Sequence, residues 1–264
     1  FREGSKVCIR VSGVTMDSPG HYVYLRDDDT GEYWGISWQP VGKPLDKAND
    51  TCRHGLSYSV YTCEYNGIYA EQTLFIPRGD NVELWDVKIQ NRSGAPRHIS
   101  VFSYAEFSFH HIDMDNRNFQ MSLYAAGASY ADGVIEQDLH YEETGYQYFA
   151  ADFEPDSFDA VREAFIGPYR TETNPFGVEN GSLSGSTEKG GNQCASLHKA
   201  FEIPANGEVS TCFMLGEGRR EQGLLVRQKY AKPEARTAAK AALAAYWDKK
   251  LQALQIDTPN EGMN

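Results

Sequence analysis

The chain of 264 residues lacks the positive charge and the long apolar runs that several functional classes require. Its 25 Lys and Arg are outnumbered by 37 Asp and Glu, which gives a formal net charge of -12. Nucleic acids and anionic membrane surfaces attract basic patches, so this balance argues against both as partners. A transmembrane helix needs about 18 consecutive apolar residues, and the sequence has no such run and no opening signal-peptide pattern.

Cysteine is scarce, and its spacing is irregular. The odd count of five contains no Cys-x-x-Cys pair and no Cys/His pair at zinc-finger spacing. The five are Cys8, Cys52, Cys63, Cys194 and Cys212. We therefore expect buried free thiols in a reducing compartment and a cytoplasmic protein.

Aromatic residues are abundant, with 16 Tyr, 13 Phe and 4 Trp, and they favour strands. Short strand patterns separated by turn residues run from Lys6 to about Leu215 without intervening helices. Residues 81–90 place Trp85, Val87 and Ile89 on one face, and residues 98–109 are apolar on both faces, as in a strand buried on both sides. This pattern predicts a mainly β, antiparallel sandwich or barrel.

The sequence becomes helical from Glu221, and Pro233 suits the first turn of a helix. One apolar stripe follows at helical spacing, formed by Ala239, Leu243, Trp247, Leu251 and Leu254. We interpret this helix as a connector to a further domain. The start at Phe1 without Met and the end in a polar run lead us to expect a piece of a longer protein.

Two acidic motifs raise the question of a metal site. Asp27-Asp28-Asp29 lacks calcium-loop spacing and precedes Thr-Gly, so a turn is favoured over a hard-cation site. The segment 110–116 (HHIDMDN) could hold a metal or an acid/base pair. Adjacent His residues on a strand point to opposite faces, so we favour a polar loop at a strand end. The sequence predicts no metal site.

Two further motifs could act on or bind a substrate. Cys52 and His54 could form a nucleophilic pair, but no oxyanion loop accompanies them, so we favour a buried thiol and a strand-end histidine. The loop 167–177 (GPYRTETNPFG) carries Arg, Glu, Asn and two Thr, which can hydrogen-bond sugar hydroxyls or phosphate. A self-contained loop tied by internal bonds explains it equally well, and both interpretations stay open.

Several long stretches resemble the amino-terminal region of the cellobiose and cellodextrin phosphorylases, the inverting β-glucoside phosphorylase family. They include YLRDDDTGEYWGISWQPVGKPLD (24–46), TCRHGLSYSVYTCEYNGI (51–68), VFSYAEFSFHHIDMDNRNFQMSLYAAGASY (101–130) and REAFIGPYRTETNPFGVENG (162–181). Within the family, FHHIDMDNRNFQMSLYAAG and the YRTETNP loop look more like the cellodextrin phosphorylases than the cellobiose-specific members. The detailed match argues against the related sandwich of glucoamylase-type hydrolases.

The resemblance implies a large antiparallel β-supersandwich over residues 1–218 and a helical linker over 219–264. The linker would lead to an (α/α)6 catalytic barrel of the same chain, and TPNEGMN (258–264) looks like that junction. The implied reaction is reversible phosphorolysis of cello-oligosaccharides by inorganic phosphate, which releases α-glucose 1-phosphate without a metal or organic cofactor. A cellobiose or laminaribiose phosphorylase, or a stand-alone carbohydrate-binding module, are the alternatives.

In this family the general acid and the phosphate ligands lie in the barrel, so the resemblance implies no catalytic residue here. It also implies a homodimer in which the β domain borders the partner's active site. The expected substrate-binding candidates on that rim are Arg170, Glu172, Asn174, His110, Asn116 and Gln120.

Overall fold

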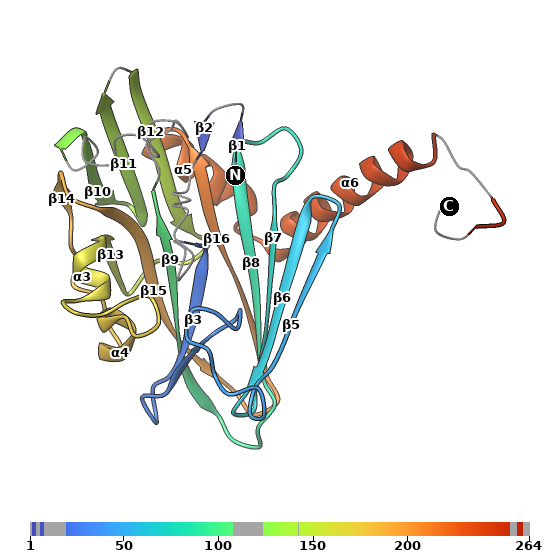
Figure 1. Ribbon diagram of the computed structural model, residues 1–264, viewed down its shortest axis with the longest axis horizontal. Helices are drawn as coiled ribbons and strands as arrows, with labels where there is room; N and C mark the ends of the chain where they lie inside the picture. Colours follow the sequence, from blue (N-terminus) through green and yellow to red (C-terminus); the bar gives the residue numbers. More distant parts are fainter. Residues whose placement is uncertain are drawn as a thin grey trace.

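The computed structural model describes residues 2–3, 6–7, 20–107, 124–141, 143–253 and 258–260. Two antiparallel sheets pack face to face, and two helices near the carboxyl end follow them (Figure 1). The predicted mainly β sandwich with a helical end is therefore confirmed. A small separate ribbon of β1 (Arg2–Glu3) and β2 (Lys6–Val7) precedes it.

The larger sheet has nine strands. In spatial order they are β14 (Glu188–Lys189), β10 (Ala126–Ala131), β11 (Val134–Tyr141), β12 (Glu143–Ala151), β16 (Glu208–Glu217), β8 (Val82–Asn91), β7 (Ile68–Phe75), β6 (Tyr58–Tyr65) and β5 (Asn49–Gly55). Asn66-Gly67 and Asp132-Gly133 close two of its hairpins, and all four residues have positive φ. Two-residue hairpin turns require that conformation, which Asn, Asp and Gly adopt most readily.

The smaller sheet has five strands, in the order β13 (Ser157–Val161), β15 (Gln193–Ile203), β9 (Arg97–Glu106), β3 (Tyr22–Asp27) and β4 (Tyr33–Gly35). Its central strand β9 is buried on both faces, as predicted. Val101 lies in the core between the sheets, while Phe102 and Tyr104 face a second cluster. The short helices α3 (Arg162–Ile166) and α4 (Phe176–Asn180) cover that second cluster.

The main core lies between the two sheets. Trp85, Val87 and Ile89 all face it from β8, which confirms the face predicted from their spacing. Trp85 packs edge-on against Phe149 and Phe213, with ring centroids 5.1 and 6.2 Å away. These rings join β8, β12 and β16, so the centre of the large sheet is held by aromatic packing.

The helices α5 (Arg220–Tyr230) and α6 (Pro233–Leu251) lie on the outer face of the large sheet. Leu243 is buried there, and Ala239 and Trp247 pack beside it, so much of the predicted apolar stripe covers this chain's own sheet. Leu251 is 57% exposed, and Leu254 lies outside the described residues. Among the described helices, none has the length and apolarity to span a membrane.

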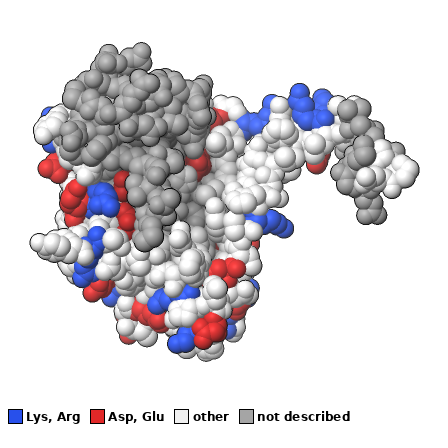
Figure 2. All heavy atoms as spheres, in the orientation of Figure 1, with Lys and Arg blue, Asp and Glu red and all other residues white. Residues whose placement is uncertain are grey.

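The far end of α6 projects from the body of the molecule (Figure 1). On the face shown in Figure 2, acidic and basic side chains are interspersed, and basic ones gather along this projecting end. Lys249 and Lys250 occupy its last turn, where they complement the negative end of the helix dipole. The polar character of these turns explains why they can lie in solvent.

Candidate functional site

The loop predicted to bind a ligand connects α3 to α4 and is tied by its own side chains. The Asn174 Oδ1 accepts hydrogen bonds from the Thr171 backbone N–H at 3.0 Å and from its hydroxyl at 3.4 Å. Arg170 pairs with Glu179 and donates to the Asn174 carbonyl oxygen at 3.2 Å. At the tip, Tyr169 is fully exposed with φ at 59°. The loop is therefore tied by internal bonds, as one of the two interpretations predicts.

A partly exposed arginine anchors this loop to the smaller sheet. Arg162 donates from Nη2 to Glu172 Oε1 at 2.6 Å and from Nε to Glu106 Oε1 at 2.8 Å. Tyr104 donates to the same Glu106 oxygen at 2.7 Å, and Tyr24 donates to the Glu172 carbonyl oxygen at 2.8 Å. One guanidinium thus bridges two buried carboxylates, which fixes the base of the loop.

The protonation states in this cluster follow from burial and charge. Burial lowers the pKa of Arg162, but Tyr104, Glu106 and Glu172 outweigh it and raise that pKa overall. Burial, followed by the neighbouring carboxylates, raises the pKa of Tyr24 and of Tyr104. At neutral pH the arginine is therefore charged, and both phenols keep the protons that they donate.

The six predicted binding residues fall into three groups. Arg170 and Asn174 lie on the solvent side of the loop, with Arg170 partly exposed. Glu172 instead turns inward and is 5% exposed, because its carboxylate binds Arg162. His110, Asn116 and Gln120 lie outside the described residues.

Arg162 and Glu106, which position the loop, are not among the residues predicted from the sequence. The sequence nevertheless contains one indication of this ion pair. Glu106 interrupts the doubly apolar segment 98–109, and a carboxylate buried there requires a cationic partner. Its distance from Arg162 along the sequence concealed that partner.

The Asp-rich motif forms a turn, as predicted. Asp27 Oδ1 accepts the Asp29 backbone N–H at 3.0 Å, and Asp27 Oδ2 pairs with Arg97 at 2.5 Å. Asp29 pairs with His98 at 2.9 Å. Within the part of the chain that the structure describes, no group of three or more His, Cys, Asp or Glu is placed to hold a metal ion.

Three of the four described cysteines follow the prediction. Cys63, Cys194 and Cys212 are buried free thiols. The prediction of a buried thiol at Cys52 is wrong, because β5 lies at the edge of the large sheet and leaves this side chain exposed. Cys8 lies outside the described residues.

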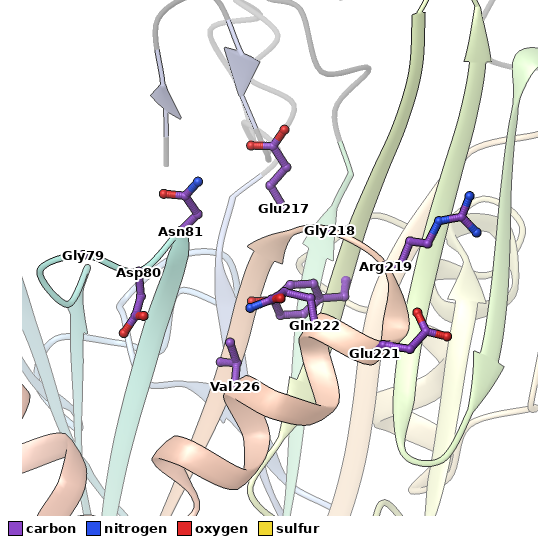
Figure 3. Close-up of a pocket in the computed structure, with 10 residues that line it drawn as sticks. Gly79, Asp80, Asn81, Glu217, Gly218, Arg219, Glu221, Gln222 and Val226 are labelled. Carbon is purple, nitrogen blue, oxygen red and sulfur yellow. The ribbon is translucent and has the colours of Figure 1, made fainter.

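A cavity of about 820 Å³ opens beside the start of α5 (Figure 3). Its lining comes from the β7–β8 loop, from Tyr148 on β12 and from the β16–α5 junction. The named polar residues are Asp80, Asn81, Glu217, Arg219, Glu221 and Gln222. The cavity is not predictable from local sequence patterns, because three segments that are distant in the sequence build it. Such a lining offers donors and acceptors to a hydroxylated ligand.

Part of that lining is already engaged in internal contacts. Asp80 accepts from Lys229 Nζ at 2.6 Å and from the Tyr230 hydroxyl. Arg219 stacks on Tyr146, with its guanidinium carbon 3.9 Å from the ring centroid. These contacts fix the two sides of the cavity, and they leave the amides of Asn81 and Gln222 among the groups that line it.

The chain is similar to known proteins over most of its length. Residues 8–233 match the family model described as "Glycosyl hydrolase 94, supersandwich domain". The chain is 49% identical over 253 residues to the N,N'-diacetylchitobiose phosphorylase of Vibrio proteolyticus, which covers 95% of this chain and 32% of that protein. It is 47% identical to the enzyme of the same name from Vibrio furnissii, with the same coverage. The chain thus spans about a third of the length of these curated relatives.

Among solved structures, a bacterial glucoamylase complexed with acarbose is similar, with a TM-score of 0.57. It is 9% identical and covers 95% of this chain and 33% of its own, so the likeness is one of fold alone. The family match spans most of the sandwich and both helix starts. The chain belongs to the glycosyl hydrolase 94 family and comprises its supersandwich domain.

Proposed function

We propose that this chain is the non-catalytic β domain of an inverting glycoside phosphorylase that acts on N,N'-diacetylchitobiose. The observation that carries the proposal is the identity of 49% and 47% to two phosphorylases of that name across 95% of the chain. These relatives favour the diacetylated disaccharide over the cellodextrins expected from the sequence. A cytoplasmic location and a homodimer remain proposals, derived from the cysteine pattern and from the family resemblance.

The state of the carboxylates supports a non-catalytic role. Inverting phosphorolysis needs one carboxylic acid to protonate the leaving oxygen, because phosphate replaces the attacking water. Glu106 and Glu172 are both buried and bound to the Arg162 guanidinium. A carboxylate held inside the domain in this way cannot reach the leaving oxygen of a glycosidic bond, so neither suits the role of general acid. We place that acid outside this chain, in the catalytic barrel.

We assign the loop 167–177 to the rim of the substrate cleft. Its outward groups, Arg170 and Asn174, are the ones that could contact sugar or phosphate, while Glu172 holds the loop in place from inside. Arg170 would exchange its partner Glu179 for the ligand. His110, Asn116 and Gln120 remain candidates for the same rim from the sequence.

The test is phosphate release in the synthetic direction, with two pairs of sugars. One pair is α-N-acetylglucosamine 1-phosphate with N-acetylglucosamine, and the other is α-glucose 1-phosphate with cellobiose. We expect activity only in the longer protein that continues into the barrel, and only with the acetamido sugars. Activity of the 264-residue chain alone would refute the non-catalytic role, and turnover of the glucose pair alone would restore the cellodextrin assignment.

Saccharide binding by the domain itself is the second candidate, and the cavity beside α5 favours it. Titration calorimetry of the chain with N,N'-diacetylchitobiose would measure it. Binding that is lost in Asn81→Ala but kept in Arg170→Ala would assign the sugar to the cavity. No heat with the isolated chain would reject this candidate.

A further inference from the structure

Three polar side chains come together on the exposed edge of the large sheet. Cys52 and His54 are two residues apart on β5, so they project from the same face of the strand. Ser59 on β6 is the cross-strand partner of His54, and Tyr61 is the partner of Cys52. Both β5 residues are exposed to solvent. The hairpin therefore presents a thiol, an imidazole and a hydroxyl side by side.

The distances connect these groups in one chain. Cys52 Sγ lies 3.3 Å from His54 Nε2, and His54 Nδ1 lies 2.8 Å from Ser59 Oγ. A hydroxyl oxygen is a good acceptor and a thiol sulfur is a poor one. The favoured tautomer thus has its proton on Nδ1, donated to Ser59, and leaves Nε2 free to accept the proton of the Cys52 thiol.

Tyr61 supports the same thiol from across the hairpin. Burial, followed by the charge of Cys52 and a hydrogen bond to it, raises the pKa of the Tyr61 hydroxyl. Tyr61 therefore keeps its proton and can donate it to the sulfur when the thiol ionises. The imidazole of His54 stands edge-on to the Tyr61 ring, with centroids 6.4 Å apart.

The other described thiols are buried, in contrast to the exposed Cys52. Cys194 and Cys212 are completely buried, and burial raises the pKa of each. Burial, and then Asp50, also raises the pKa of Cys63. A thiol reacts as its thiolate, so these three are inert in the folded chain. Any selective thiol chemistry in the described part of the chain falls on Cys52.

We propose that Cys52 is a modification site that forms reversible mixed disulfides with small-molecule disulfides, assisted by His54. The Cys52 thiol passes its proton to His54 Nε2, and the thiolate attacks one sulfur of the incoming disulfide. A new S–S bond forms as the old one breaks, and the leaving thiolate takes the proton from the imidazolium. A second thiol reverses the reaction by attacking the mixed disulfide. The incoming disulfide is itself the oxidant, so the reaction needs no other.

The test measures the rate of labelling by a dipyridyl disulfide, which releases a coloured thione on reaction. All variants carry Cys8→Ser, so that only the four described cysteines remain. In this background the three changes to compare are Cys52→Ser, His54→Asn and Ser59→Ala. Peptide mass spectrometry after treatment with glutathione disulfide then identifies the modified cysteine, and an added dithiol tests reversal.

We expect one fast-reacting thiol per chain, lost in Cys52→Ser and slowed by about tenfold in His54→Asn. Ser59→Ala should slow it less, because the imidazole remains. Equal rates in the parent and His54→Asn would refute the role of the histidine. Labelling spread evenly over the cysteines, or protection of Cys52 in the longer phosphorylase, would overturn the site itself. Circular dichroism of each variant checks that the fold is retained.

Discussion

Arg236 Nε lies 2.7 Å from Asp86 Oδ1, although the arginine side chain has no exposed surface. Its Nη1 also donates to Asp152 Oδ2 at 3.0 Å and to the Tyr230 carbonyl oxygen at 3.0 Å. Asp152 in turn accepts from the Thr211 hydroxyl at 2.7 Å. One guanidinium therefore joins helix α6 to strand β8, to the end of β12 and to the end of α5.

Replacing Arg236 by Met should destabilise the chain strongly. The substitution keeps the apolar part of the side chain but leaves Asp86 and Asp152 without their cation. Removing one partner of a buried ion pair costs about 3–5 kcal/mol, and chemical denaturation would measure that loss. Lys88→Ala is the control, because its partner Glu208 is exposed, and it should stay close to wild type. Equal stability of both variants would show that the buried network contributes little.

Two leucines on α6 form a matched pair. Leu243 is 5% exposed and packs on the large sheet, whereas Leu251 is 57% exposed. Leu243→Ala should lower the free energy of unfolding by about 2–4 kcal/mol, as for buried leucines in general. Leu251→Ala should change it by less than about 0.5 kcal/mol in this chain. A comparable loss at both positions would mean that the end of the helix is also buried in solution.

Stability should fall at acidic pH because of Glu83. Burial opposes the ionisation of this carboxyl, but His21, with Nδ1 2.8 Å from Glu83 Oε1, outweighs it and lowers the pKa to about 2. The folded pKa lies below the ordinary value of 4.5, so the contribution is complete above pH 4.5 and is lost as the pH falls towards 2. Denaturation curves of wild type and Glu83→Gln should converge over that window. Parallel curves would contradict this assignment.

Arg170→Ala should lower the kcat/KM of the longer phosphorylase without changing its melting temperature. The side chain is partly exposed and pairs with an exposed carboxylate, so its loss leaves the core intact. Glu179→Gln is the informative control, because it releases Arg170 while keeping the loop's size. If Arg170 contacts the ligand, Glu179→Gln should keep its activity. If the ion pair only shapes the loop, both variants should lose kcat/KM to the same extent. Unchanged kinetics in both variants would show that the loop is not part of the substrate site.

The sequence predicted those features that depend on short-range patterns. The structure confirms the predicted face of Trp85, Val87 and Ile89 and the predicted burial of β9 on both faces, because side-chain periodicity is a local property of the sequence. The sequence does not show that β5 is an edge strand, because that depends on which strand ends the sheet. The prediction for Cys52 is wrong for that reason. The inward turn of Glu172 depends on Arg162, ten positions away across a helix. The cavity beside α5 likewise depends on long-range assembly.

The place of β16 in the large sheet has a consequence for how the chain acquires its structure. Strands β5 to β8 form one antiparallel block and β10 to β12 another, and β16 is hydrogen-bonded to both, pairing with β8 on one side and β12 on the other. On a ribosome, neither block can join the other until residues 208–217 have emerged. Both blocks expose unpaired edges until then, and such edges favour aggregation. The domain is therefore expected to fold late and slowly during synthesis, with its last strand as the closing element.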